Sequence, residues 1–297
     1  MIATSMHNVD CFWLLATDSD GAYLGALPLI REQWCFLKRY LSMPFGTYGG
    51  LVLAQGEEAL GGDLVRALAG LLADSGAHSF FCALAPRGRP WSEDLTSTLG
   101  RTATLETSTH VLELNGDFDA VWKGFQKRNR AVIRKAFEAG AVARVVSGAK
   151  PARTLYSLYR RQARGWRGHS TYPYRLIEAC STYSGRQFAQ IWQALINDEI
   201  HSSLLAVYDD HEVFPWLMGS TPQSRRTGIN NFLLSELIRD ACSRRVDRVN
   251  LGGSMGDPGI EHFKRAFGAV KTPAMQYVWD SRSAALARRA MRFVRGR

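Results

Sequence analysis

The 297-residue chain lacks paired cysteines, long apolar runs and an apolar leader. Its five cysteines are odd in number and never spaced as CxxC, which predicts free thiols in a reducing compartment rather than disulfides or a zinc site. No run of about 18 apolar residues is present, which argues against a membrane-spanning helix. The N-terminal segment lacks the basic start and apolar core of a secretion signal. We expect a cytoplasmic globular protein with two domains, since a domain typically has about 100–200 residues.

Signatures of metal and nucleotide enzymes are also missing. The sequence has no HExxH, no clustered His, Cys and Asp, no GxGxxG and no GxxxxGK[ST]. We interpret Gly253-Ser254-Met255-Gly256 as a glycine-rich loop and not as the nucleophile elbow of a hydrolase. The seven histidines are isolated from one another in the sequence. We therefore expect no metal ion and no resident cofactor.

The charge is strongly positive and unevenly distributed. The net charge is +10, and the tail from Ser281 to Arg297 carries six arginines and no acid. The segment 117–139 adds six basic residues against three acids. Its candidate phosphate-binding residues are Lys127, Arg128, Arg130 and Arg134. Such clustering favours a polyanionic partner, namely nucleic acid, a nucleotide diphosphate or anionic lipid. The alternative is a solvated helix face and a frayed basic tail.

Hydrophobic periodicity predicts strands and helices along the whole chain. Strands are expected at residues 11–17, 22–30, 34–37, 79–85, 107–114, 141–146, 187–196, 200–208, 213–220, 248–251 and 270–279. Helices are expected at residues 57–73, 117–140, 152–165, 174–182, 230–243 and 260–267. The pattern repeats in the two halves, so we predict two related α/β modules. They are residues 1–140 and 141–280, followed by a basic helix or tail at 281–297.

The helix expected at 117–140 has the clearest two-sided pattern. At 100° per residue, four apolar side chains gather on one side: Trp122, Phe125, Val132 and Ala136. Three basic side chains gather opposite them: Lys127, Arg130 and Arg134. Gly140 is a natural stop for this helix.

A glycine-punctuated junction between a strand and a helix forms the first candidate site. Arg225, Arg226, Gly228 and Asn230 lie just before the apolar helix at 230–243. Amides at a helix N-terminus bind anions, Gly228 permits close backbone approach, and the arginines add positive charge. A pyrophosphate or a ribose phosphate fits this arrangement. The alternative is an ordinary loop with an asparagine cap.

The second candidate site joins a glycine-rich loop to a short helix. Gly253 and Ser254 belong to the loop, and the helix offers Lys264 between Phe263 and Phe267. A lysine near a strand end can neutralise a phosphate or a developing oxyanion. The alternative is a surface lysine whose stem covers two core phenylalanines. We expect Lys264 to be half-exposed, so that Lys264→Ala leaves the fold intact.

Four segments together resemble the FemABX and BioF2-like acyltransferase families of the GNAT superfamily. They are PFGTYGG at 44–50, which contains Tyr48, the basic segment 123–140, the helix start NNFLL at 230–234, and NLGGSMGDPGIEHFKRAFGA at 250–269. The last segment is the most specific, because its glycine-rich loop, FK and FG follow the family's order. The resemblance covers nearly the whole chain.

The resemblance implies an α/β fold of the α+β kind. It consists of two tandem GNAT-like domains, each a mixed, mostly antiparallel sheet flanked by helices, with a cleft between them. It also implies that Lys264 lies in the acyl-transfer site with Phe263 as its aromatic neighbour, and that the basic segment contacts phosphate. Asn230 departs from the [QR]xxGx[GA] loop that binds the diphosphate of coenzyme A in GNAT proteins, which disfavours acyl-CoA.

Three functions follow as hypotheses. The first is transfer of an aminoacyl group from aminoacyl-tRNA, as co-substrate, to an amine of a small peptide, a peptidoglycan-precursor-like acceptor or a nucleotide-linked amine, which makes a peptide bond. The second is an acyl-CoA-dependent N-acyltransferase that acts on an amino sugar or amino acid. The third is a non-catalytic module that binds RNA, or a membrane peripherally, through the basic tail.

Overall fold

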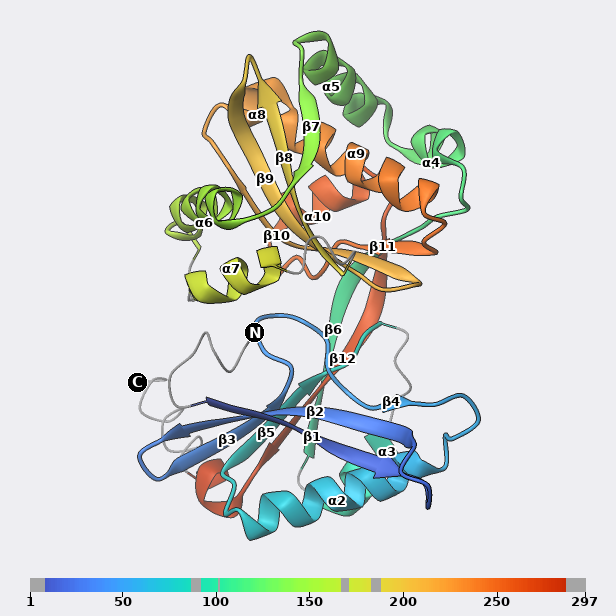
Figure 1. Ribbon diagram of the computed structural model, residues 1–297, viewed down its shortest axis with the longest axis vertical. Coiled ribbons are helices and arrows are strands. Elements are labelled where there is room, and N and C mark those ends of the chain that lie inside the picture. The colour runs from blue at the N-terminus through green and yellow to red at the C-terminus, as the bar shows by residue number, and fades with distance from the viewer. Residues whose placement is uncertain (1–8, 87–91, 101, 167–170, 183–187, 287–297) are drawn as a thin grey trace. The chain divides into compact units, whose positions relative to one another are not determined.

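The computed structural model describes residues 9–86, 92–100, 102–166, 171–182 and 188–286, and it has a mixed α/β architecture (Figure 1). The chain divides into two compact units. Among the described residues, the first unit comprises those from 9 to 107 and from 273 to 286, and the second unit comprises those from 108 to 272. The predicted α/β class with mixed sheets and flanking helices is confirmed.

The units differ from the division that we predicted at residue 140. That position lies inside the second unit, because α5 (Lys127–Glu138) packs on α9 (Ile229–Ser243) and β7 (Val142–Val146) pairs with β8 (Ala189–Ile196). The observed division falls within two strands instead, β6 (Thr102–Glu113) and β12 (Val270–Asp280). A division inside a strand leaves no Gly- or Pro-rich linker for the sequence to reveal.

The first unit is a sheet with strand order β1-β2-β3-β5-β12. Its further elements are β1 (Val9–Thr17), β2 (Tyr23–Trp34), β3 (Leu37–Ser42), β4 (Val52–Leu53), α2 (Leu60–Asp74), β5 (Ser79–Ala83) and α3 (Ser92–Leu99). The β3–β5 pair is parallel, whereas β1–β2, β2–β3 and β5–β12 are antiparallel. Helix α2 packs on β1 and β2 (Figure 1), and its leucines join the core around Phe80 and Tyr277.

The hairpin between β2 and β3 corrects one predicted strand. Residues 34–37 were expected to form a strand, but Trp34 ends β2, Leu37 begins β3, and the two residues are paired. Cys35 occupies the turn with a φ of 50°, a left-handed conformation typical of tight hairpins. The chain therefore reverses where the apolar residues alone suggested a continuous strand. Helix α3 was not predicted.

The second unit is a sheet with strand order β6-β11-β10-β9-β8-β7. Its further strands are β9 (Glu199–Tyr208), β10 (Glu212–Ser220) and β11 (Arg248–Asn250). Its further helices are α4 (Phe118–Gly124), α6 (Ala149–Ala163), α7 (Tyr174–Thr182), α8 (Ser224–Thr227) and α10 (Pro258–Arg265). Only β10–β11 is parallel among the pairs that are described here. Helices α6 and α9 both pack on β8 and β9 (Figure 1), and β8 is buried along nearly its whole length.

The helix predicted at 117–140 is two helices. Phe125 and Gln126 between α4 and α5 are extended, with ψ of 143° at both residues. The Phe125 side chain is 2% exposed and contacts Phe267 at a ring-centroid distance of 5.0 Å. The backbone N–H of Gln126 donates to the carbonyl oxygen of Ala266 at 3.0 Å. A contact with α10, distant in the sequence, thus breaks the helix.

The side of α5 that faces the core is close to the predicted one. The buried residues of α5 are Asn129, Ile133 and Ala136. Counted at 100° per residue, these three positions lie within about 40° of Trp122, whereas Val132 is only half-buried. The prediction of one continuous helix is wrong, because the chain is extended at Phe125 and Gln126.

The described residues include no helix that is long and apolar enough to cross a membrane. All five cysteines are free, with Cys82, Cys180 and Cys242 buried. Within the described ranges, no group of three or more His, Cys, Asp or Glu side chains is placed to hold a metal ion. The tail arginines from Arg288 onward lie outside the described residues, so the predicted basic helix stays a prediction.

Candidate functional site

Lys264 is the centre of a compact polar site in the second unit. Helix α10 begins at the cap residue Asp257, whose side chain accepts the N–H groups of Gly259 and Ile260, and Pro258 is at its first position. Lys264 lies in the last turn and is 7% exposed. Its Nζ atom donates to the carbonyl oxygens of Gly252, at 2.8 Å, and Gly253, at 2.7 Å. These contacts attach the helix to the glycine-rich loop after β11.

The ammonium group of Lys264 is held by carbonyl oxygens alone in the part of the chain that the structure describes, since no carboxylate there forms a salt bridge with it. Burial lowers the pKa of Lys264 to about 8, because a charged group is poorly solvated away from water. Our expectation of a half-exposed lysine is therefore wrong. Replacing Lys264 with alanine would leave two carbonyl groups without this donor and would create a cavity.

Position 252 favours glycine because of its backbone conformation and its close neighbours. Its φ is 74°, and a Cβ atom there would lie 3.3 Å from the ring of Phe214 and 3.9 Å from Nζ of Lys264. Its carbonyl oxygen accepts both Nζ of Lys264 and the backbone N–H of His110, the latter at 3.1 Å. Its own N–H donates to Oδ1 of Asn250 at 3.0 Å. Hydrogen bonds with Lys264, His110 and Asn250 therefore hold Gly252 in place within the second unit.

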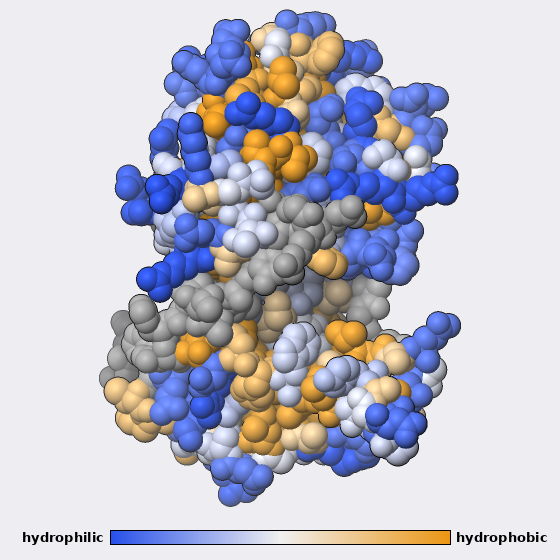
Figure 2. Space-filling view, viewed as in Figure 1, coloured by the Kyte–Doolittle hydropathy of each residue, from blue (hydrophilic) through white to orange (hydrophobic). Residues whose placement is uncertain are grey.

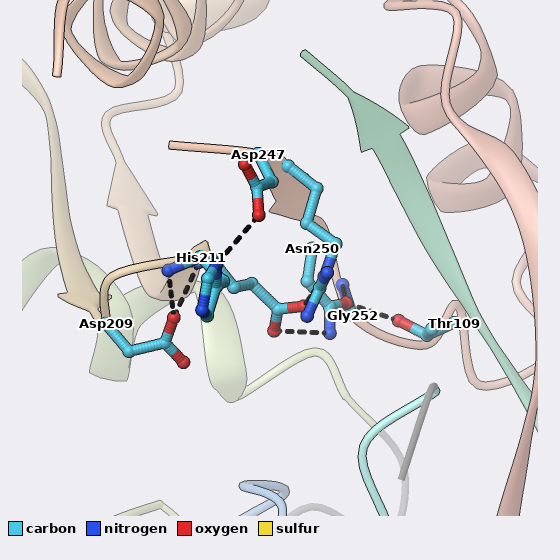
Figure 3. Close-up of polar contacts among 8 residues, drawn as sticks. Thr109, Asp209, His211, Asp247, Asn250 and Gly252 are labelled. Carbon is cyan, nitrogen blue, oxygen red and sulfur yellow. Dashed lines mark hydrogen bonds and ion pairs between the residues drawn. The ribbon is translucent and has the colours of Figure 1, made fainter. Parts of the chain in front are cut away.

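A buried network anchors the strand that carries this loop (Figure 3). Oδ1 of Asn250 accepts the hydroxyl of Thr109 at 2.6 Å, and its amide nitrogen donates to Oε1 of Glu212 at 3.0 Å. The other oxygen of Glu212 accepts Nε of Arg248 at 2.8 Å. Side chains of β6, β10 and β11 thus converge on Asn250. Sequence reasoning missed this network because its members lie far apart in the chain.

The turn before β10 is held by a second, exposed set of contacts (Figure 3). Oδ1 of Asp209 accepts the backbone N–H of His211 and that of Glu212. Nδ1 of His211 lies 2.8 Å from Oδ2 of Asp247. These contacts orient the turn from which Glu212 enters the buried network.

His110 is the second titratable group that the structure places beside Lys264. It is fully buried on β6, and neither ring nitrogen has a hydrogen-bond partner among the described residues. Burial lowers its pKa, and the positive charge of Lys264 lowers it further. We therefore expect a neutral imidazole at physiological pH. The sequence contains one isolated histidine here, which gave no signal of this role.

Phe263 precedes Lys264 in the chain, and Ser254 follows Gly253, whose carbonyl oxygen accepts Nζ of Lys264. Ser254 is buried, and Phe263 is half-buried against Phe267 at a centroid distance of 5.3 Å. Gly252, Ser254 and Gly256 have the GxSxG spacing of a nucleophile elbow, which our interpretation of this loop as merely glycine-rich did not include. The geometry still differs from a nucleophile elbow, which exposes a strained serine. Ser254 is buried and has no positive φ, and within the described residues it bonds to no histidine.

The junction at Gly228 is packed closely against α5. Gly228 has a φ of 71° and begins α9. A Cβ atom there would lie 2.9 Å from the carbonyl oxygen of Val132 and closer still to its side chain. The close approach that the glycine permits is thus made by α5. Asn230 is half-buried, and its amide nitrogen donates to the hydroxyl of Ser220 at 3.2 Å.

The basic residues that we predicted to bind phosphate lie on α5 and α8, and they differ in exposure and in hydrogen bonding. Lys127, Arg128 and Arg134 on α5 are exposed. Nη1 of Arg130 instead donates to the carbonyl oxygen of Lys123 at 2.8 Å and to that of Phe125, which caps the end of α4. Arg226 on α8 is exposed, whereas the side chain of Arg225 lies outside the described residues.

Tyr48 belongs to the first unit and is half-buried. Two glycines follow it, and the N–H of Gly50 donates to the hydroxyl of Ser42 at 2.9 Å. The structure thus brings four of the predicted residues together in the second unit: Gly253, Ser254, Phe263 and Lys264. A place for Tyr48 in the same site stays a prediction.

Comparison with known proteins agrees with this geometry. Residues 123–265, which include α5, the Gly228 junction and Lys264, match the family model of the Acetyltransferase (GNAT) domain. This segment is therefore similar to GNAT domains. The match supports the general part of our prediction, namely that the protein is an acyltransferase of the GNAT kind. No curated protein matches the sequence.

Solved structures extend the likeness to the whole chain. FemX shares 12% identity over 90% of this chain and 88% of its own, with a TM-score of 0.68. The C-terminal domain of a putative lysylphosphatidylglycerol synthetase from Agrobacterium fabrum shares 11% identity, with coverages of 93% and 86% and a TM-score of 0.63. A tandem GNAT protein from the clavulanic acid biosynthesis pathway shares 12% identity, with coverages of 92% and 83% and a TM-score of 0.58. The resemblance to FemABX proteins is confirmed as a likeness of fold.

Proposed function

We propose that the protein transfers an aminoacyl group from aminoacyl-tRNA to an amine and thereby makes a peptide bond. The observation that carries the proposal is the buried ammonium group of Lys264, held by two carbonyl oxygens on the glycine-rich loop of a GNAT-like domain. An ammonium has three N–H donors. With two donated to Gly252 and Gly253, one remains for a ligand oxygen.

That remaining donor suits the chemistry of ester aminolysis. The amine attacks the ester carbonyl, so a C–N bond forms while the C–O bond to the ribose breaks. Negative charge builds first on the carbonyl oxygen, where Lys264 stabilises it. The proton that leaves the amine ends on the released ribose hydroxyl. Fixed donors in a dry site stabilise such an oxyanion more than water does, and positioning supplies the rest of the rate.

Phe263 supports Lys264 by shape rather than by charge. Its ring packs against Phe267, which contacts Phe125 at the break between α4 and α5. This aromatic row fixes α10 and with it the direction of the lysine stem. We propose that the half-buried face of Phe263 forms an apolar wall of the acyl-binding site.

Two features support tRNA as the donor in preference to acyl-CoA. Lys127, Arg128 and Arg134 present exposed positive charge on α5, which suits a polyanion. Val132 fills the space beside Gly228 where a diphosphate would approach the backbone. We propose a small peptide, a peptidoglycan-precursor-like molecule or a nucleotide-linked amine as the acceptor.

An acyl-CoA-dependent N-acyltransferase that acts on an amino sugar or amino acid is the second candidate. The match to an acetyltransferase domain favours it. The same lysine donor would serve a thioester as well as an ester, so Lys264 does not separate the two donors. A non-catalytic RNA- or membrane-binding module is the third candidate, and its basic tail lies largely outside the described residues.

The test offers both donors to the protein. The protein is incubated with tRNA charged with a mixture of amino acids, or with acetyl-CoA, and with a panel of peptides and amino sugars, and products are followed by mass spectrometry. We expect a new amide from aminoacyl-tRNA. An amide formed only from acetyl-CoA would replace the first candidate by the second, and no amide from either donor would contradict the acyltransferase.

Lys264→Met, with Lys271→Met as its control, tests the role of the lysine. Lys271 is exposed on β12, and both variants remove one charge from the second unit. We expect Lys264→Met to lose transfer by about 100-fold or more, as enzymes do when they lose one oxyanion donor, and Lys271→Met to keep it. Circular dichroism shows whether each variant is folded. Full transfer by a folded Lys264→Met variant would refute the role of Lys264.

A further inference from the structure

One stretch of the chain contains basic residues and no acid. Residues 139–177 hold eight Lys and Arg residues and neither Asp nor Glu. Helix α6 lies within this stretch and carries five of these eight residues from Lys150 to Arg164, its C-cap. This is a larger charge excess than that of the segment 117–139. It belongs to the second unit but lies on a different helix from the residues near Lys264.

A groove of about 470 Å³ lies along α6, and its lining is basic and aromatic. The lining residues are Arg153, Tyr156, Ser157, Arg160, Arg161, Arg164 and Tyr174. We name it the α6 groove. All four arginines are exposed, and none forms an ion pair within the described residues. Hydrophilic residues dominate the surface over α6 in Figure 2. The groove therefore presents four arginines that are not paired with a carboxylate among the described residues.

The two tyrosines form the apolar part of the lining. The rings of Tyr156 on α6 and Tyr174 on α7 lie 5.3 Å apart between centroids. The guanidinium group of Arg160 lies over the Tyr156 ring at 5.6 Å. The hydroxyl of Tyr174 donates to Glu178 at 3.0 Å, which fixes the ring. Arginines beside half-buried aromatic rings can hold phosphates while a base stacks on a ring.

The spread of charge indicates the size of the ligand. Arg153 and Arg164 are eleven residues apart, which is about 16 Å along a helix at 1.5 Å per residue. A single phosphate or diphosphate is shorter than this row. One strand of a nucleic acid carries a phosphate about every 3.4 Å of duplex axis, so the row matches about five phosphates.

We propose that the α6 groove binds an RNA strand, with the arginines on its phosphates and the tyrosines beside its bases. The inference rests on the proposed function in one respect, namely that the donor there is a tRNA. A lipid surface suits the groove less well. The lining is concave and its apolar members are two half-buried tyrosines, whereas membrane-binding helices carry a protruding apolar face.

The experiment compares two double variants of the full chain. Arg160→Gln with Arg164→Gln removes two charges from the α6 groove. Arg144→Gln with Arg245→Gln removes two exposed charges elsewhere in the second unit, from β7 and from the turn after α9. Binding of fluorescently labelled, uncharged tRNA is measured by anisotropy between 50 and 200 mM salt. Vesicles of phosphatidylglycerol form a parallel arm.

We expect the groove variant to lose about 10-fold in tRNA affinity near 0.1 M salt, and its salt slope to fall by about 1.4. The control should bind as the wild type does. Equal loss in both variants, or no loss in the groove variant, would overturn the proposal. So would a groove variant that loses vesicle binding and keeps tRNA binding. Thermal unfolding confirms that both variants are folded.

The assay separates this proposal from the proposed function, because uncharged tRNA has no acyl group to transfer. Binding through the groove without any transfer of aminoacyl groups would retain the groove and refute the aminoacyltransferase. Transfer from aminoacyl-tRNA with an unaffected groove variant would retain the enzyme and refute the groove.

Discussion

The Nζ atom of Lys264 lies 2.8 Å from the carbonyl oxygen of Gly252, an oxygen that also accepts the backbone N–H of His110 at 3.1 Å. One peptide group thus joins α10, the glycine-rich loop and β6. The contact buries a positive charge beside a buried imidazole that has no hydrogen-bond partner among the described residues. Both groups titrate, so the pH dependence of folding reports on this site.

The first prediction concerns stability in alkali. The pKa of Lys264 is about 8 in the folded protein against 10.5 for a free lysine, so the unfolded chain binds more protons between these values. Rising pH therefore favours the folded state in this window, by up to about 3 kcal/mol in total. Lys264→Met lacks this contribution. Urea unfolding from pH 7 to 10 should show the wild type gaining stability relative to the variant above pH 8, whereas parallel curves would contradict the buried charge.

The second prediction concerns stability in acid. The pKa of His110 is lowered in the folded protein, so below the ordinary histidine value of 6.5 the unfolded chain takes up a proton more readily. The wild type should lose stability as the pH falls from 7 to 5, at no more than about 1.4 kcal/mol per pH unit from this group. His110→Leu should flatten this loss. His262→Leu, at an exposed position of α10, is the matched control for the loss of an imidazole in these urea titrations.

The third prediction tests whether packing against α5 explains the glycine at position 228. Gly228→Ala places a Cβ atom against Val132 and holds alanine at a φ of 71°. Gly140→Ala has a similar φ of 79° but nothing within 4 Å of its Cβ atom. The backbone cost is about 1–2 kcal/mol at either position, and overpacking adds about 1–3 kcal/mol at Gly228. If urea unfolding gives equal losses for the two variants, the contact with α5 does not explain the glycine.

The fourth prediction compares two carboxylates near one turn. Glu212 is buried and shared between Arg248 and Asn250, whereas Asp247 is exposed and contacts His211. Glu212→Ala should cost about 3–5 kcal/mol, because it leaves a partly buried guanidinium and an amide unpaired. Asp247→Ala should cost less than about 1 kcal/mol. Denaturant midpoints measure both, and a small loss at Glu212 would remove the network as an anchor of β11.

The sequence predicted the elements that local pattern specifies. The strands predicted at 11–17 and 22–30 correspond to the β1–β2 hairpin, with the turn formers Asp18 to Gly21 between them, and helical spacing predicted α7 at the bounds that are observed. Polar turns likewise separated β8, β9 and β10. In each case the signal and the structure that it specifies lie within a few residues, so periodicity and turn chemistry were sufficient.

Contacts between distant residues account for what the sequence left open. Phe125 breaks a helix by packing on Phe267, and Val132 packs against Gly228 at the start of α9. Neither partner is visible in a local window. The burial of Lys264 depends in the same way on Gly252 and Gly253. The charge of the acid-free stretch at 139–177 is a property of the sequence, but the α6 groove also depends on the packing of α7 against α6.

The last prediction divides the basic residues of α5 by role. Lys127 and Arg134 are exposed, so Lys127→Gln with Arg134→Gln should change the free energy of unfolding by less than about 0.5 kcal/mol per site. The same variant should weaken tRNA binding and flatten its salt dependence. Arg130→Gln should instead cost about 2 kcal/mol of stability, because the carbonyl oxygens of Lys123 and Phe125 lose a charged donor. Urea unfolding and tRNA anisotropy on the same samples measure both effects. An Arg130→Gln variant that is fully stable but binds tRNA poorly would make Arg130 a ligand-binding residue and not a cap of α4.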